Sequence, residues 1–63
     1  MYIHQEKNDM ARERYINSDM ITYIDAKHND TTVYYECYIV GDEYPLTITE
    51  ETLEKILIEK GWV

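Results

Sequence analysis

The side chains that could perform catalysis in this sequence are few, and their spacing matches no catalytic arrangement. Cys37 is the only cysteine and lies in an apolar and aromatic stretch, while Ser18 is the only serine and lies in a segment typical of a turn. A catalytic nucleophile needs a base and a group that orients the base. No histidine lies near Cys37 in the sequence, so we expect Cys37 to act as a small apolar residue. The sequence therefore indicates a protein that is not an enzyme.

Patterns for metal ions and phosphate groups are also missing. His4, His28 and Cys37 could share a metal ion, but their spacing fits no known ligand pattern. The chain has two glycines, too few for a phosphate-binding loop. The acidic pairs Asp42-Glu43 and Glu50-Glu51 are typical of solvated turns and helix starts. We expect no catalytic residue, no metal and no cofactor.

The charge of the chain narrows the class of partner. The chain has thirteen acidic and six basic residues, which gives a net charge of −7. Direct binding of nucleic acid needs a basic footprint, so it is not expected, and an anionic membrane is a poor partner for the same reason. The acidity either keeps the protein soluble or attracts a basic partner. Seven tyrosines and no phenylalanine favour a half-exposed contact surface, because a tyrosine has an apolar ring and a polar tip.

The length predicts one small domain over residues 1–63. A single cysteine permits no internal disulfide and fits a reducing compartment. The sequence shows neither a secretory leader nor an apolar run long enough to span a bilayer. These features predict a cytoplasmic protein.

The first half of the chain predicts strands. Residues 1–16 are ambiguous between a helix and a hairpin, and we favour a strand over 2–7, a turn at 8–9 and a strand over 11–17. Turn residues at 17–19 then precede a strand over 20–25. Residues 27–30 predict a polar turn.

The second half predicts one hairpin and a helix. The stretch TTVYYECYIV at 31–40 is the clearest strand, residues 41–43 predict a tight hairpin, and a strand over 44–49 returns, at the sheet edge because of Pro45. Thr49 is a suitable N-cap and Gly61 a suitable C-terminal cap of the following helix. Leu53, Ile56 and Leu57 form its inward stripe, and we expect Trp62 to fold back onto Ile56 or Leu57. The expected fold is α+β, with a small antiparallel meander of three to four strands packed against one C-terminal helix.

The predicted sheet has more apolar surface than one helix can cover. Val33, Tyr35, Cys37 and Ile39 would face the helix, whereas the opposite face would carry Tyr34, Glu36, Tyr38 and Val40, with Tyr23 or Tyr44 beside them. This second face could be covered by the N-terminal segment, by closure of the sheet into a barrel, or by another chain, or it could stay partly exposed. Ile58 points away from the inward stripe of the helix, which makes it a further contact candidate.

One resemblance concerns residues 19–53, DMITYIDAKHNDTTVYYECYIVGDEYPLTITEETL. This stretch resembles the small early inhibitors of uracil-DNA glycosylase from phi29-like phages, because Tyr34-Tyr35-Glu36 and Leu46-Thr47-Ile48-Thr49-Glu50 match a YYE-like element and the strand that enters a helix. The resemblance implies an acidic dimer that presents carboxylates like DNA phosphates and encloses an apolar side chain of the enzyme. The chain departs from that family at both ends, with a longer N-terminus and no clear strand after the helix.

A second resemblance is to the SwrD/FlbD-like flagellar accessory proteins. Residues 15–21 followed by Ile24-Asp25 look like their LNxDLIxxIE element, and ITEETLEKI at 48–56 looks like their strand-to-helix segment. This resemblance implies a meander with a C-terminal helix and little about biochemical activity.

Together these observations predict a non-enzymatic inhibitor or regulator, of phage type, that occupies the basic nucleic-acid-binding surface of an enzyme, with uracil-DNA glycosylase as a candidate target. The alternative is a small homodimeric accessory protein of the SwrD/FlbD-like type, without nucleic-acid mimicry. The residues that we expect to contact the partner are Tyr34, Glu36, Tyr38, Asp42, Glu43, Glu50, Glu51, Glu54 and Ile58.

Overall fold

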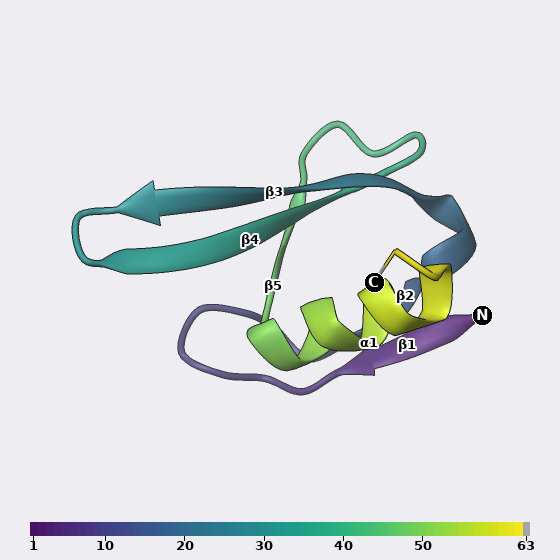
Figure 1. Ribbon diagram of the computed structural model, residues 1–63, viewed down its shortest axis with the longest axis horizontal. Helices are drawn as coiled ribbons and strands as arrows, with labels where there is room; N and C mark the ends of the chain where they lie inside the picture. The colour runs from purple at the N-terminus through teal and green to yellow at the C-terminus, as the bar shows by residue number, and fades with distance from the viewer. Residues whose placement is uncertain (63) are drawn as a thin grey trace.

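The strands of this protein are divided between two antiparallel sheets. The computed structural model describes residues 1–62. Its elements, in chain order, are β1 (Tyr2–Gln5), β2 (Arg14–Asn17), the short 3-10 helix η1 (Ser18–Met20), β3 (Ile21–Asn29), β4 (Thr32–Ile39), β5 (Leu46–Ile48) and α1 (Glu50–Lys60). Strands β1 and β2 form one sheet, and β3, β4 and β5 form the other in that spatial order. The expected α+β fold with a C-terminal helix is confirmed (Figure 1).

The N-terminal segment forms a hairpin, not a helix. Strand β1 pairs with β2 from Tyr2↔Asn17 to Gln5↔Arg14, so both strands are shorter than predicted. Instead of a tight turn at residues 8–9, the chain reverses through a longer 6–13 connection with a bend at 9–11. There the Asn8 Oδ1 accepts hydrogen bonds from the backbone N–H groups of Met10 and Ala11, each at 2.8 Å. Such an Asn side chain stabilises a turn in place of a backbone acceptor.

Strand β3 is longer than predicted, so the polar turn expected at residues 27–30 is wrong for its first three residues. Strand pairing continues to Asn29↔Thr32, and only Asp30 and Thr31 turn the chain. Asp30 has a φ of 50°, a left-handed conformation that aspartate tolerates. The β3–β4 hairpin extends beyond α1 (Figure 1), where polar side chains such as Lys27 fit a strand exposed to solvent.

Strand β5 is shorter than predicted. It spans Leu46–Ile48 only, and residues 40–45 form a longer connection than the expected tight turn, with Gly41 at a φ of 85°. Pro45 has no N–H to donate to β4, which fits the start of β5 at the next residue, Leu46. The Tyr44 side chain before it is exposed. The predicted edge position is confirmed, since β5 pairs only with β4 among the described strands.

Helix α1 begins and ends at the predicted caps. The Thr49 side chain accepts a hydrogen bond from the Thr52 N–H at 3.1 Å, and Gly61 adopts a left-handed conformation. The Trp62 N–H donates to the Leu57 carbonyl at 2.9 Å, so the chain folds back at the helix end as predicted. Ile56 is the most completely buried side chain of α1.

The hydrophobic core lies on one face of the β3–β4–β5 sheet, which we call the inner face. Side chains from both sheets and from α1 meet there: Ile3, Ile16, Ile21, Cys37, Ile48 and Ile56. Gln5 joins the layers, since its buried side chain donates to the Arg12 carbonyl at 2.8 Å and accepts from the Thr49 N–H at 2.9 Å. The N-terminal hairpin and α1 therefore cover the same face of the larger sheet.

Candidate partner-binding surfaces

The opposite face of the β3–β4–β5 sheet, which we call the outer sheet face, carries three cross-strand pairs. Tyr23 lies opposite Tyr38, Asp25 opposite Glu36, and Lys27 opposite Tyr34. Because side chains alternate along a strand, these six residues point away from Cys37 and the core. The outer sheet face thus unites Tyr34, Glu36 and Tyr38, as predicted from the alternation in β4, and places Tyr23 beside them.

No element within residues 1–62 covers the outer sheet face. The N-terminal segment does not fold across it, because Ile3 and Ile16 pack into the core on the inner face. The sheet is not closed into a barrel either, since β3 and β5 are its two edges. Two of the predicted ways to cover the tyrosines are therefore excluded for this part of the chain. Exposure to solvent or contact with another molecule remains.

Tyr23 and Tyr38 form a stacked aromatic pair on the outer sheet face. Their ring centroids are 4.3 Å apart, and the ring planes differ by 13°. A register shift between Ile21 and Tyr23 brings the Tyr23 side chain onto this face. The Thr22 hydroxyl also donates to the Tyr38 carbonyl at 3.2 Å. The pair presents a flat apolar area with two phenol groups, which suits an interface anchor.

Carboxylates lie next to this aromatic pair. The Lys27 Nζ lies 4.0 Å from the Asp25 carboxylate and 3.9 Å from the Glu36 carboxylate. One ammonium group thus lies between two carboxylates, and the three side chains together carry a net charge of about −1. Partial desolvation raises the pKa of Tyr38, Glu36 and Asp25 add to this rise, and Lys27 opposes it. The Tyr38 phenol is therefore protonated near neutral pH and can donate a hydrogen bond to a partner.

The negative charge is unevenly distributed along the chain. Residues 1–17 contain three acidic and three basic side chains, which leaves ten acidic and three basic side chains in the remainder. The whole net charge of −7 therefore belongs to η1, the larger sheet, the connections and α1. This part of the molecule is the one that would attract a basic surface.

The other predicted contact residues are dispersed. Asp42 and Glu43 lie in the connection at one end of β5, whereas Glu50, Glu51 and Glu54 lie in α1 beyond its other end. The structure does not unite them into one array of phosphate-like charges. Glu50 and Glu51 do line a shallow groove of about 270 Å³ together with Tyr34 of the larger sheet.

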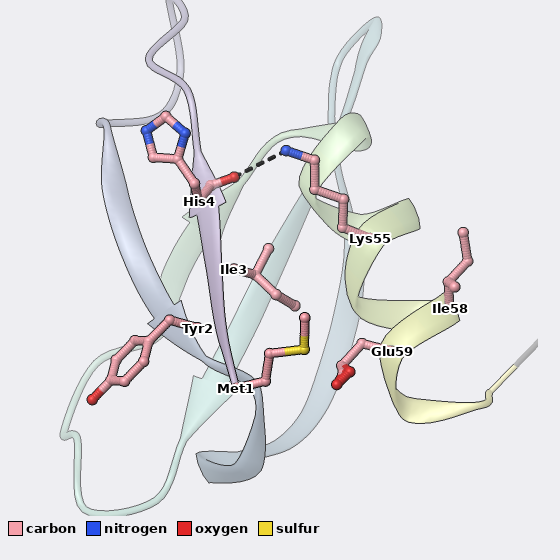
Figure 2. A pocket seen from close by; sticks show the side chains of 7 residues that line it. All are labelled: Met1, Tyr2, Ile3, His4, Lys55, Ile58 and Glu59. Carbon is pink, nitrogen blue, oxygen red and sulfur yellow. Dashed lines mark hydrogen bonds between the residues drawn. The ribbon is translucent and has the colours of Figure 1, made fainter.

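Ile58 lies on a separate surface from the tyrosines of the outer sheet face. It lines an open groove of about 400 Å³ between β1 and α1, together with Met1, Tyr2 and other residues of both elements (Figure 2). Met1, Tyr2 and Ile58 are exposed to 68%, 67% and 73%. The Lys55 Nζ crosses this groove and donates to the His4 carbonyl at 3.1 Å (Figure 2). Since α1 packs on the inner face, Ile58 and Tyr38 lie on opposite sides of the larger sheet.

Cys37, His4 and His28, which were considered for catalysis or a metal site, lie on three different strands. Cys37 is fully buried, and desolvation raises the pKa of its thiol to about 11, so the thiolate nucleophile is scarce near neutral pH. His4 lies 2.7 Å from the Glu13 carboxylate and stacks on Tyr15. Residues 1–62 contain no cluster of three or more His, Cys, Asp or Glu side chains that could hold a metal ion.

Three residues that shape or support these surfaces were not predicted from the sequence. Asp25 and Lys27 were assigned to a strand end and a turn, so their place beside Glu36 was not recognised. Gln5 belonged to the predicted strand over 2–7 without a prediction of which way its side chain points, and the structure buries it fully. The apolar residues at 3 and 16 were the available signal, because a hairpin pairing them directs Gln5 inward as well.

Comparison of the chain with protein-family models, with curated proteins and with solved structures finds no match. Within residues 1–62, no helix combines the length and the apolar character that crossing a membrane requires.

Proposed function

We propose that this chain is a non-enzymatic acidic binding protein that occupies the basic nucleic-acid-binding surface of an enzyme and so inhibits or regulates it. The observation that carries this proposal is the outer sheet face. A stacked tyrosine pair lies there beside Asp25 and Glu36, and no element of residues 1–62 shields it. Such a face combines apolar anchors with groups that pair with lysine and arginine.

The negative charge and the tyrosine pair act at different stages of association. The excess negative charge of residues 18–63 accelerates encounter with a basic surface, and added salt screens this effect. Tyr23 and Tyr38 then become buried against the partner, while Asp25 and Glu36 accept hydrogen bonds from its cations. Steering therefore governs the association rate, and the tyrosines govern the lifetime of the complex.

Uracil-DNA glycosylase is the proposed target because of the resemblance of residues 19–53 to phage inhibitors of that enzyme. The matching residues lie in suitable elements: Tyr34-Tyr35-Glu36 lies within β4, and residues 46–50 comprise β5, the N-cap and the first residue of α1. Glu36 and Tyr34 belong to the outer sheet face. These positions support the choice of target.

The test is inhibition of a purified uracil-DNA glycosylase acting on uracil-containing DNA. We expect the wild-type chain to inhibit competitively with DNA, with a slower association at high salt. Glu36→Lys and Tyr38→Ser should each weaken inhibition by about tenfold or more, the effect of losing an interface anchor. Glu6→Lys is the matched control for charge, because Glu6 is exposed in the connection of the N-terminal hairpin, whose Ile3 and Ile16 pack on the inner face.

Absence of inhibition by a folded wild-type chain would contradict the proposed target. Equal inhibition by wild type, Glu36→Lys and Tyr38→Ser would contradict the proposed surface. The alternative function, a homodimeric accessory protein whose tyrosine face is the dimer seam, predicts instead that Tyr38→Ser dissociates the chain in the absence of any partner.

A further inference from the structure

The free edge of β3 is the longest unpaired strand edge in residues 1–62. Strand β3 runs from Ile21 to Asn29 and pairs only with β4. Asn29 and Thr32 close a two-residue turn, and residues that close such a turn exchange hydrogen bonds across the hairpin. Hydrogen-bonded pairs alternate along an antiparallel ladder. Lys27 and Asp25 therefore bond to β4, while Ile24, Ala26 and His28 direct their N–H and C=O groups away from it.

These outward backbone groups have no partner within residues 1–62. No backbone bond outside the paired strands reaches Ile24, Ala26 or His28. An unpaired edge of this kind is a template for another strand. A second strand placed there would satisfy the backbone groups of all three residues.

We propose that a second copy of this chain pairs with this edge, β3 against β3 in antiparallel orientation, about a two-fold axis at Ala26. The inference is independent of the proposed function, because it concerns the chain alone. In this register Ala26 meets the partner's Ala26, and Ile24 meets the partner's His28. Each of these pairs joins residues whose N–H and C=O groups point away from β4. Both copies therefore supply donors and acceptors to the hydrogen bonds between the two β3 strands.

The charges on β3 select this register. With the axis at Ala26, Asp25 lies opposite the partner's Lys27 on the outer sheet face, and the symmetry repeats the pair. With the axis one residue earlier, Asp25 would face the partner's Asp25. With the axis one residue later, Lys27 would face the partner's Lys27. Opposite charges across a strand pair stabilise it and like charges destabilise it, so the axis at Ala26 is favoured over both neighbours.

An apolar groove beside this edge gives the partner strand a second contact. Ile24 and Ala26 line it together with Leu53, Leu57 and Trp62 of the helix end, and its volume is about 400 Å³. The Trp62 side chain is 47% exposed there. Side chains of the partner strand that point to the inner face, the partner's His28 foremost, would lie over this groove. The pairing also joins the two outer sheet faces into one surface.

Charge exchange at the two positions tests the register. In sedimentation equilibrium at physiological salt, we expect a wild-type dimer, and about tenfold or greater weakening by Asp25→Lys or Lys27→Asp alone, because each creates two like-charge pairs. An equimolar mixture of the two variants should dimerise again, since opposite charges then meet at both positions. Asp9→Lys, in the distant 6–13 connection, is the control. It makes the same change in net charge as Asp25→Lys, from −7 to −5, and should not weaken the dimer.

A covalent test locates the axis. Ala26→Cys in a Cys37→Ala background should form an intermolecular disulfide on mild oxidation, because hydrogen-bonded antiparallel residues have Cα atoms about 5.5 Å apart, within the range for a disulfide. Circular dichroism of every variant verifies folding. A wild-type chain that stays monomeric up to its solubility limit overturns the proposal. So does a dimer that Tyr38→Ser dissociates and Asp25→Lys leaves intact. Neither result bears on inhibition of the glycosylase, which is measured separately.

Discussion

At the residue scale, two buried side chains have functions that are structural and not chemical. Cys37 contributes apolar volume to the core and is held as a neutral thiol by its surroundings. Gln5 replaces solvent for backbone groups of two segments, since it donates to the Arg12 carbonyl in the β1–β2 connection and accepts from the Thr49 N–H between β5 and α1. Both residues could have been mistaken for site residues from their chemical type alone.

Because of Cys37, we expect the free energy of unfolding to fall at alkaline pH. Its pKa rises from 9.0 to about 11 on folding, so the folded state binds the proton more tightly than the unfolded state. The resulting stability is present below pH 9 and is lost as the pH rises towards 11. Against Cys37→Ala, the advantage of wild type in the free energy of unfolding should fall by on the order of 2 kcal/mol over this interval. Urea denaturation at several pH values measures it, and a constant difference would contradict the assignment.

Replacing Gln5 by an apolar residue of similar size should lower the free energy of unfolding strongly. Gln5→Met removes the acceptor of the buried Thr49 N–H and the donor to the partly buried Arg12 carbonyl, which leaves both backbone groups without this partner. We expect a loss of about 2–3 kcal/mol in the free energy of unfolding, measured by urea denaturation. The exposed neighbour in Glu6→Met is the control and should change stability by less than about 0.5 kcal/mol.

At the element scale, strong local signals in the sequence predicted the elements, and long-range contacts decided their lengths and partners. Thr49 and Gly61 fixed both ends of α1, and the alternation in β4 identified the two faces of the sheet. The extent of β3 was not predictable from its polar second half, because Lys27 belongs to a strand only through its neighbours on β4. Likewise, nothing local to residues 1–17 shows that Ile3 and Ile16 pack on the inner face. From the sequence, the candidate site was therefore predicted for β4 and, as one of two options, for Tyr23 of β3, whereas Asp25 and Lys27 of β3 were missed.

The N-cap of α1 can be tested with two variants of Thr49, one that removes the hydroxyl and one that keeps it. The Thr49 hydroxyl accepts a hydrogen bond from the Thr52 backbone N–H at 3.1 Å and donates one to the Thr52 hydroxyl at 2.8 Å. Thr49→Ala should lower the free energy of unfolding by about 1 kcal/mol, whereas Thr49→Ser keeps the hydroxyl and should cost clearly less. Thermal unfolding followed by circular dichroism compares them. Equal losses would show that the hydroxyl is not the stabilising group.

At the scale of the whole molecule, the proposed function rests on an asymmetry between the two faces of one sheet. The N-terminal hairpin and α1 both pack on the inner face, and the outer sheet face is left to the tyrosine pair and its carboxylates. The first 17 residues are neutral overall, so the part of the chain that bears this face also bears the net charge. The free edge of β3 allows a second copy to extend this face without covering it.

The measurement that tests this asymmetry most directly is solvent paramagnetic relaxation in NMR, with a soluble gadolinium chelate added to the isolated chain. The Tyr23 and Tyr38 ring protons should relax strongly, while the methyl groups of Ile16 and Ile56 should be protected. This contrast should persist in the dimer, because β3 pairing leaves the outer sheet face open. Protection of the Tyr23 and Tyr38 rings equal to that of the two isoleucines, at protein concentrations where the chain is monomeric, would show that the chain covers this face itself, and would contradict the account.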